Sequence, residues 1–595
     1  MKIYESKGDF DMKKLFLVSA LLIATLVLAA CGQDSAESGT AGGTTGGMGA
    51  TAAAGAEAAG IPTDREHYTF RMHFNYAWFT PNPWGGDDLS AYWAEKFNIT
   101  MVPTSPDANE METLNLMIMA DDLPDVIWMD RSPHNVEMSR LGLFVPIDDM
   151  VAMVDNNWYH DNILASTQAF YAVDGVNYTI PNWARQGIVG QPGQATGGNN
   201  AWMITTNIWE AVGSPELNTL EDLFDYMIAV RDAGLTNSAG VPVIPMLTNA
   251  GPNFGADFLN LALLRAHGGV PDGWWFSILE DGTHGFLPRS ETWRTSLMEL
   301  NRWHREGLFP TTNLTNSLDQ FLEAVTTGRG ALIFYDHSAD DQNRFRAILR
   351  ETDPGNSIEV VTSIYNGRTI TMLPARGLSP DRIYHEHHAT LGWNGSFITT
   401  SAEQPERIFE FLTWLLTPEG SAEMMYGPPG GIWDYLDADG IPVFNTLPVE
   451  LTAEELISLG AWRWDIHGHA NHVDRIKFAV NNSLPEEMRT WVETMQYEVF
   501  TPNLMITDEF AVIALSIEPG TDLHISRTFI SDNMEAVLPQ IIMAPTEDDA
   551  LRLLDDALAF AEANNIAEIE RVQNERYQYN LSVQGGTIFR APGSP

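Results

Sequence analysis

The chain has 595 residues, of which 33 are Lys or Arg and 79 are Asp or Glu, so its formal net charge is −46 at pH 7. A chain this acidic repels phosphate backbones and anionic headgroups, which excludes nucleic acids as partners. Hydrophobic residues make up 44% of the sequence and include 18 Trp, which indicates a well-packed globular body long enough for two large domains.

A secretion signal is the first element that the sequence predicts, and it ends at the only cysteine of the chain. Lys13 and Lys14 precede an almost entirely apolar stretch, residues 15–30, and small residues stand directly before Cys31. The stretch falls short of the roughly 20 apolar residues that span a bilayer. A cysteine in this position resembles the bacterial lipobox, which implies cleavage after Ala30 and a lipid on Cys31. An ordinary signal peptide is the alternative, but it leaves a lone thiol unexplained.

Residues 31–60 are rich in Gly, Ala, Ser and Thr. Such a composition buries no core and behaves as a flexible chain. We therefore expect residues 1–30 to be a lipoprotein signal peptide and residues 31–60 to be a tether. The lipid on Cys31 would hold the body at the extracellular face of the cell membrane.

The body alternates strand and helix patterns, which indicates an α/β architecture. Each strand and helix unit is about 30 residues long, as a βαβ crossover requires. The first predicted elements are a strand at 68–75, a helix at 89–97, a strand at 99–102, a helix at 110–120 and a strand at 125–129.

Further along the chain, seven short motifs follow one another in a recognisable order. They lie at 114–126 (LNLMIMADDLPDV), 142–149 (GLFVPIDD), 174–182 (DGVNYTIPN), 202–205 with 217–223, 303–308 (WHREGL), 328–334 (GRGALIF), and 405–414 with 417–420. This order resembles bacterial extracellular solute-binding proteins of family 1, over roughly residues 68–430. Similarity in the closing helix, 565–579, is weaker.

The resemblance implies a two-lobed periplasmic-binding-protein fold of type II, in which each lobe is a sheet flanked by helices. The chain would cross between the lobes near Ala201 and Gly392, so both lobes are discontinuous. Lobe 1 would comprise residues 61–200 and 392–470, and lobe 2 residues 201–391 and 471–580, with a tail at 581–595. The implied function is that of an ABC importer's binding lipoprotein, which captures a sugar or oligosaccharide between the lobes and delivers it to the membrane permease. We expect a monomer without a cofactor.

Candidate ligand-binding residues follow the predicted strands, because ligands of open α/β sheets bind outside the carboxyl ends of strands. Aromatic rings offer apolar faces to the C–H side of a sugar, and carboxylates and amides bond its hydroxyls, so the mixture suits a neutral carbohydrate. Candidates at strand ends are Asn75, Tyr76, Trp78, Trp128, Asp130, Tyr335 and Asp336, and candidates near the two crossings are Trp183, Arg185, Trp393 and Asn394. Four other tryptophans lie in helical patterns and are interpreted as packing residues, namely Trp209, Trp293, Trp303 and Trp414.

Catalysis and metal binding find less support. Carboxylate pairs such as Asp121/Asp122 and Glu486/Glu487 are adjacent in sequence, which does not oppose them across a scissile bond, and the chain contains no Gly-x-Ser-x-Gly, P-loop or His-Glu-x-x-His motif. Histidines at 385–388 and 467–472 match no familiar zinc spacing, and an acidic turn at 434–439 lacks the EF-hand pattern. We therefore predict a non-enzyme without a metal.

Two alternatives remain within the binding function. The ligand is a peptide or another polar solute, or the protein is a surface glycan-binding lipoprotein that works without a transporter. Residues 433–490 match no motif of the family and are interpreted as an insertion that reshapes the cleft.

Overall fold

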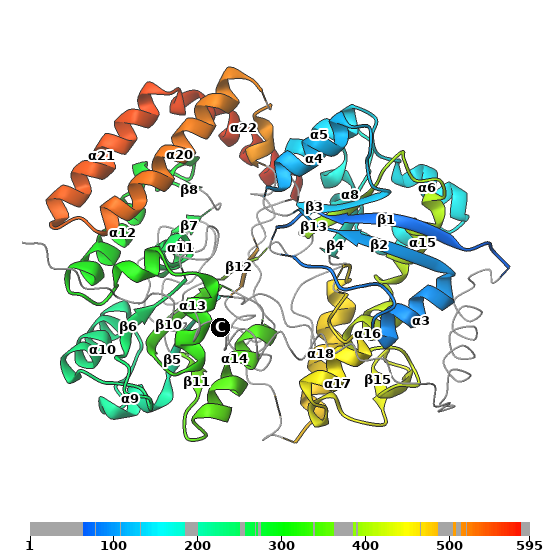
Figure 1. Ribbon diagram of the computed structural model, residues 1–595. Coiled ribbons are helices and arrows are strands. Elements are labelled where there is room, and N and C mark those ends of the chain that lie inside the picture. Colours follow the sequence, from blue (N-terminus) through cyan, green and yellow to red (C-terminus); the bar gives the residue numbers. More distant parts are fainter. Residues whose placement is uncertain are drawn as a thin grey trace, which may run out of the picture. The chain divides into compact units, whose positions relative to one another are not determined.

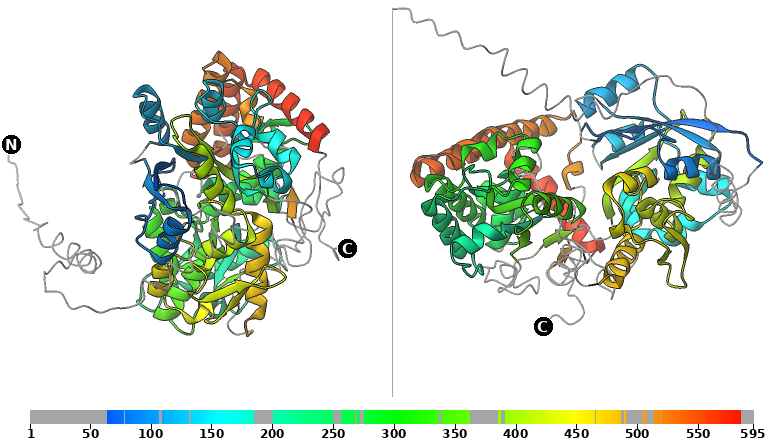
Figure 2. Two further views of the ribbon diagram at one scale, coloured as in Figure 1. Left: turned by 90° about the vertical axis from the view of Figure 1, so that its right-hand side faces the viewer. Right: turned by 60° about the horizontal axis from the view of Figure 1, so that its bottom comes forward.

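Two separate β-sheets, each surrounded by helices, form the framework of the protein (Figures 1 and 2). The computed structural model describes residues 64–584, with gaps at 78, 107–108, 131–132, 185–199, 250–255, 268, 272–274, 337–338, 362–384, 388–390, 465, 486–488, 490–503, 507–512 and 519. The expected signal peptide, the tether and Cys31 therefore lie outside the described residues.

The first sheet has five strands in the order β2-β1-β3-β13-β4. Strand β1 pairs in parallel with β2 and β3, and β13 pairs antiparallel with β3 and β4. The amino-terminal half of β13 therefore lies beside the carboxyl end of β3, with Asn394 opposite Asp130. The strands are β1 (Tyr68–Phe74), β2 (Ile99–Thr104), β3 (Val126–Asp130), β4 (Ile180–Ala184) and β13 (Leu391–Ile398).

Both faces of this sheet are covered, as a strand that is buried on both sides predicts. Val126 and Trp128 of β3 belong to a large hydrophobic core, whereas Ile127 and Met129 belong to a smaller one on the opposite face. Helices α4 (Glu110–Met119) and α5 (Pro133–Arg140) contribute to the smaller core. The large core, called the first core below, also receives side chains from α3 (Asp88–Phe97), α6 (Ile147–Val154), α15 (Pro405–Trp414), α16 (Pro418–Tyr426) and α18 (Ala470–Ser483).

The second sheet has four strands in the order β11-β5-β10-β6. They are β5 (Asn200–Thr205), β6 (Ile244–Leu247), β10 (Gly330–Asp336) and β11 (Ile358–Val360). A second core surrounds this sheet and extends into the three carboxyl-terminal helices. The helices of the second core are α10 (Leu220–Ala233), α11 (Ala256–Ala266), α12 (Glu291–Arg305), α13 (Leu318–Thr326), α14 (Ala339–Thr352), α20 (Asp522–Ile542), α21 (Glu547–Ala563) and α22 (Ile566–Gln584).

Shorter elements connect these parts. The remaining helices are α7 (Trp158–Asn162), α8 (Ala165–Tyr171), α9 (Thr206–Ala211), α17 (Ala453–Leu459) and the 3₁₀ turns at Leu287–Arg289, Thr311–Leu314, Pro448–Glu450 and η10 (Ile513–Ser516). The remaining strands are β7 (Val270–Pro271), β8 (Phe276–Ile278), β9 (His284–Phe286), β12 (His385–His387), β14 (Trp433–Leu436), β15 (Pro442–Phe444) and β16 (Leu504–Ile506).

Local signals place the helix ends close to the predicted positions. Helix α3 begins after Asp87, whose carboxylate accepts a hydrogen bond from the Ser90 amide, and ends at Asn98 in the left-handed region. Helix α10 begins with a capping box between Thr219 and Asp222. The five strands and helices predicted between residues 68 and 129 are thereby confirmed.

One segment expected in lobe 2 packs in the first core. Residues 471–483 belong to helix α18, whose Val473, Ile476 and Val480 lie in that core. The reason is packing against α16, the helix with which α18 makes its main contacts. Residues from Ile517 to Ile569 do contribute to the second core.

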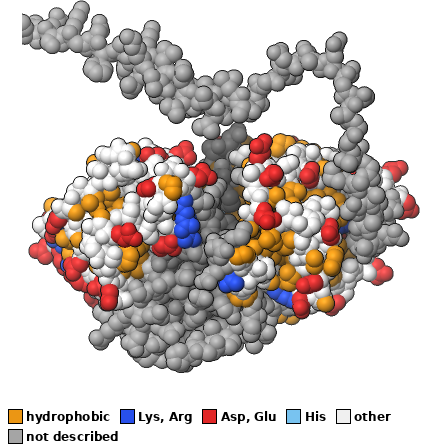
Figure 3. All heavy atoms as spheres, turned by 90° about the horizontal axis from the view of Figure 1, so that it is seen from below, with side chains coloured by type: hydrophobic (Ala, Val, Ile, Leu, Met, Phe, Trp, Pro, Cys, Tyr) orange, Lys and Arg blue, Asp and Glu red, His pale blue; other side chains and the backbone are white. Residues whose placement is uncertain are grey.

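None of the described helices combines the length and the apolar character of a membrane span. On the face shown in Figure 3, carboxylate side chains are scattered over the described surface and Lys and Arg side chains are few. This distribution agrees with the net charge of −46.

Candidate functional site

Six of the predicted ligand-binding residues meet at one end of the first sheet. Asn75 and Tyr76 follow β1, Trp128 and Asp130 end β3, and Trp393 and Asn394 lie in the adjacent half of β13. The parallel pairing of β1 with β3 brings the first four together, and the antiparallel pairing of β13 adds the last two. We call these six residues the aromatic-carboxylate cluster.

Hydrogen bonds connect three members of the cluster through the Tyr76 hydroxyl. This hydroxyl donates to Oδ1 of Asp130 at 2.7 Å and accepts a bond from Nδ2 of Asn394 at 3.0 Å. Burial of the phenol, together with the nearby Asp130 carboxylate, raises the pKa of Tyr76, so the hydroxyl stays protonated. The Asp130 side chain itself is exposed. Its carboxylate is therefore held in place by Tyr76 while remaining accessible to solvent.

The three rings of the cluster pack on one another. The Trp128 ring lies edge-on to those of Tyr76 and Trp393, with centroids 4.9 and 5.3 Å apart. Trp128 is 1% exposed and Tyr76 is 6% exposed, whereas Trp393 is 41% exposed. Trp128 thus supports the cluster from the core side, and Trp393 is the most exposed of the three rings.

A β-bulge places Trp393 in this exposed position. The register between β13 and β4 shifts between Leu391 and Asn394, which leaves one extra residue on β13. Gly392 has φ +68°, and a Cβ at this position would lie 1.8 Å from the carbonyl oxygen of Asn182. Only glycine fits so close to the neighbouring strand.

Trp183, another predicted ligand residue, lies on the facing strand β4 in a strained conformation. Its φ is +59°, which is rare for a bulky side chain. The Trp183 amide donates to the carbonyl of Gly468 at 2.7 Å, and the Gly468 amide donates to Oδ1 of Asn182 at 2.8 Å. One residue earlier, Nε2 of His467 lies 2.7 Å from Oγ of Ser396 on β13. Trp183 therefore lies on the strand next to β13, and it is half-buried.

Several buried polar atoms around the cluster have no hydrogen-bond partner among the described residues. They are Oδ1 of Asn75, Oδ1 of Asn394, Nδ2 of Asn182 and Nε1 of Trp128. Asn182 and Asn394 face each other across the strand pair and are fully buried. Unpaired buried donors and acceptors are costly in a folded protein, and a bound ligand or water would satisfy them here.

The other predicted site residues are distributed as follows. Trp78 and Arg185 lie outside the described residues. Tyr335 and Asp336 end β10 of the second sheet, where Asp336 pairs with Asn200 at the start of β5. The packing interpretation is confirmed for Trp293 and Trp303, which are fully buried, and for Trp209 and Trp414, which pack on the two cores.

The alternative metal-binding residues have structural roles where they are described. Oδ1 of Asp437 accepts hydrogen bonds from the amides of Asp439 and Ile441, which closes the turn between β14 and β15. The His469 and His472 rings lie 4.8 Å apart, and burial lowers the pKa of His472 to about 4. No three His, Cys, Asp or Glu side chains gather into a candidate metal site within the described part of the chain.

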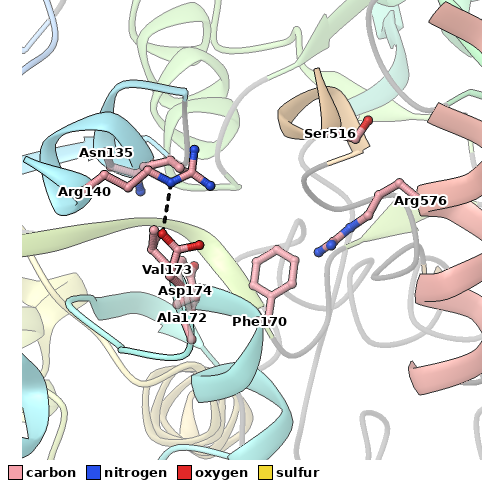
Figure 4. A pocket seen from close by; sticks show the side chains of 10 residues that line it. Asn135, Arg140, Phe170, Ala172, Val173, Asp174, Ser516 and Arg576 are labelled. Carbon is pink, nitrogen blue, oxygen red and sulfur yellow. Dashed lines mark hydrogen bonds and ion pairs between the residues drawn. The ribbon is translucent and has the colours of Figure 1, made fainter. Parts of the chain in front are cut away.

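A pocket of about 230 Å³ has a different set of lining residues (Figure 4). Its lining comes from α5, from α8 and the turn after it, and from η10 and α22. Arg140 in its wall is already paired with Asp174 at 3.1 Å and with Glu518 at 3.7 Å. The pocket contains none of the predicted ligand residues, and its one lining carboxylate, Asp174, is paired with Arg140.

Sequence reasoning missed Asn182, Ser396 and His467. A signal existed for Asn182, which precedes Trp183 on β4 and is the strand partner of Asn394. No local signal links His467 to the cluster, because the contact joins residues that are 71 positions apart.

Solved structures with a similar fold include substrate-binding proteins of ABC transporters. The ABC-transporter substrate-binding protein FusA of Streptococcus pneumoniae, solved with kestose, has a TM-score of 0.62 and 14% identity over 86% of this chain and 99% of that chain. The alginate-binding protein AlgQ2, solved without calcium, has a TM-score of 0.58 and 16% identity over 87% and 99%. A solute-binding protein associated with an HMO-binding ABC transporter of Bifidobacterium longum infantis has a TM-score of 0.58 and 13% identity over 86% of this chain and 99% of that chain.

No protein-family model matches the chain, and no curated protein matches its sequence. At TM-scores of 0.58 to 0.62 these structures share the fold of this chain, which confirms the architecture predicted from the motifs. The protein therefore has the two-lobed α/β fold of extracellular solute-binding proteins of ABC transporters.

Proposed function

We propose that the protein captures a sugar or oligosaccharide and delivers it to an ABC importer. The observation that carries this proposal is the aromatic-carboxylate cluster at the carboxyl end of the first sheet. It combines the partly exposed indole of Trp393 with the exposed carboxylate of Asp130, and this carboxylate accepts a hydrogen bond from the Tyr76 hydroxyl, to which Asn394 donates. An aromatic face and a carboxylate acceptor match the C–H face and the hydroxyls of a carbohydrate.

The solved relatives support the ligand class. FusA was solved in complex with kestose, and the other two proteins are named for alginate and HMO binding. The proposal is binding without turnover, because the cluster offers one held carboxylate and no pair of opposed catalytic carboxylates among its six residues.

A thermal-shift screen tests the ligand class. The purified protein would be heated with monosaccharides, oligosaccharides and short peptides, and the ligand would be recovered afterwards. We expect a saturable rise in the unfolding temperature with one glycan class and intact ligand. A rise with peptides alone would replace the ligand class, and recovered breakdown products would overturn the receptor function.

The membrane attachment is part of the same proposal. We infer that Cys31 carries a lipid that holds the protein at the extracellular face, next to the permease. Expression of the Cys31→Ser variant beside the unchanged chain tests this. We expect the variant in the soluble fraction or the medium and the unchanged chain in the membrane fraction, with a lipid mass found on its amino-terminal peptide. Equal fractionation of both would refute the anchor.

A further inference from the structure

A short segment from outside the matched motifs supports the edge of the candidate site. Residues 466–469, called the strap below, belong to the stretch that resembles nothing in the family and are all buried. Before the strap, the indole of Trp464 donates from Nε1 to Oδ2 of Asp87 at 2.8 Å. After it, α18 packs in the first core. The strap is therefore anchored at both ends.

The strap reaches two strands of the sheet through three hydrogen bonds. Gly468 bonds Asn182 and Trp183 on β4, and His467 bonds Ser396 on β13. Among the described residues β4 is the last strand of the sheet, and no other described strand pairs with its outer side. The two hydrogen bonds of Gly468 hold part of this outer side next to the cluster.

The bonds act where the backbone is strained. Trp183 has φ +59°, a backbone conformation that a bulky residue keeps only when contacts with its surroundings stabilise it. The Gly468 backbone lies against the Trp183 indole, since a Cβ on Gly468 would be 3.6 Å from Cε2 of that ring. Absence of a side chain at position 468 thus permits the close approach.

The contacts continue from the strap into the cluster. Asn182, which accepts the Gly468 bond, is the strand partner of Asn394, and its carbonyl oxygen lies against Gly392 in the bulge. Asn394 in turn donates to the Tyr76 hydroxyl, which holds Asp130. Displacement of Asn182 would therefore disturb the exposed ring and the exposed carboxylate together.

We propose that the strap is a positioning element of the ligand site, in which Gly468 and His467 hold β4 and the bulge of β13 in the geometry that binds the sugar. This inference rests on the proposed function. It assigns a role to the insertion that the motifs left unexplained, and the residues of the strap act through Asn182, Trp183 and Ser396.

Two substitutions of Gly468 give a graded test. In Gly468→Ala the new Cβ would lie 3.3 Å from Val473, 3.6 Å from Trp183 and 3.7 Å from Met424, which small shifts accommodate. The two extra methyl groups of Gly468→Val have no such space. We expect glycan affinity, measured by calorimetry, to fall about tenfold or more in Gly468→Val and to stay within about threefold in Gly468→Ala.

The His467 bond is tested with a double-mutant cycle. His467→Ala and Ser396→Ala each remove one partner, and His467→Gln keeps a group able to reach Ser396. We expect weaker glycan binding in both alanine variants, less than additive loss in the double variant, and recovery in His467→Gln. The control is His284→Ala, which removes a buried histidine of the second core and should leave glycan affinity unchanged.

A measurement without ligand separates this inference from the proposed function. Amide exchange in β4 should rise in Gly468→Val and in Ser396→Ala, while exchange in β2, at the opposite edge of the sheet, stays unchanged. Unchanged exchange in β4, or wild-type affinity in the folded variants, would overturn the strap's role. If the unsubstituted protein binds no glycan, the proposed function fails, and increased exchange in β4 still supports the strap as the holder of this edge.

Discussion

Lys96 of α3 and Glu423 of α16 form a buried ion pair, with 2.8 Å between Nζ and Oε1 and side chains that are 1% and 3% exposed. The other carboxylate oxygen, Oε2, accepts hydrogen bonds from the indole nitrogens of Trp93 and Trp414. The Lys96 ammonium also lies 3.6 Å from the centroid of the Trp414 ring. This group fastens α3 to α15 and α16 beneath the first sheet.

Loss of the carboxylate should cost more stability than loss of the ammonium. Glu423→Ala leaves the charge of Lys96 and two indole N–H groups without their partner, and burial already lowers the pKa of Lys96. We expect about 3–5 kcal/mol of lost stability, measured by urea unfolding. Lys96→Met leaves Glu423 with two donors and should cost less. The reverse order would contradict this account of the pair.

Trp393 should contribute to ligand affinity without contributing much to folding. The Trp393→Ala variant loses the most exposed ring of the cluster, so we expect glycan binding to weaken about tenfold or more. Because 41% of the side chain is exposed, the unfolding temperature should change little. The matched control is Tyr435→Ala, an aromatic residue on β14 that is 60% exposed and distant in sequence from the cluster. Equal effects of both variants on affinity would exclude Trp393 from the site.

The bulge at Gly392 should tolerate no side chain. Gly392→Ala puts a Cβ 1.8 Å from the carbonyl oxygen of Asn182, in addition to the strain of φ +68°. Gly440→Ala is the matched control, because Gly440 has φ +73° and no atom closer than 3.9 Å. Strain alone costs about 1–3 kcal/mol in either variant. We expect Gly392→Ala to lose clearly more stability by urea unfolding, and to lose glycan affinity. Equal losses of stability in the two variants would show that β4 can move away from Gly392 and make room for a Cβ.

His467 should make the protein less stable in mild acid. Burial lowers the pKa of His467 to about 3, whereas an unfolded histidine titrates near 6.5. Between these values the unfolded chain binds a proton that the folded protein does not, so stability falls as the pH falls below about 6.5. One histidine contributes at most about 1.4 kcal/mol per pH unit.

The comparison variant for this pH dependence is His467→Gln, which has no titrating group at the position. Urea unfolding at pH 7.5, 6.5 and 5.5 should show a smaller loss of stability in the variant than in the unchanged protein. His472, whose pKa burial lowers to about 4, adds a similar slope to both proteins and cancels from the difference. If stability depends on pH equally in both proteins, folding does not lower the pKa of His467.

The sequence by itself determined the first five strands and helices and four of the six residues of the aromatic-carboxylate cluster. Alternation and caps are local, so the strand at 68–75 and the helix at 89–97 could be predicted within one residue of β1 and α3. Asn75, Tyr76, Trp128 and Asp130 could be predicted because carboxyl ends of parallel strands meet at one edge of a sheet. Trp393 and Asn394 came from the family resemblance, through the expected return crossing.

Only the tertiary structure decided which buried faces meet. The apolar stripe of α18 predicts that this helix is buried, but not in which core, and a segment expected in lobe 2 packs in the first core for that reason. Contacts of Lys96 with Glu423 and of Gly468 with Asn182 join residues 327 and 286 positions apart. Such pairs produce no periodic pattern in the sequence, because the packing of distant segments and the burial of charge determine which residues meet.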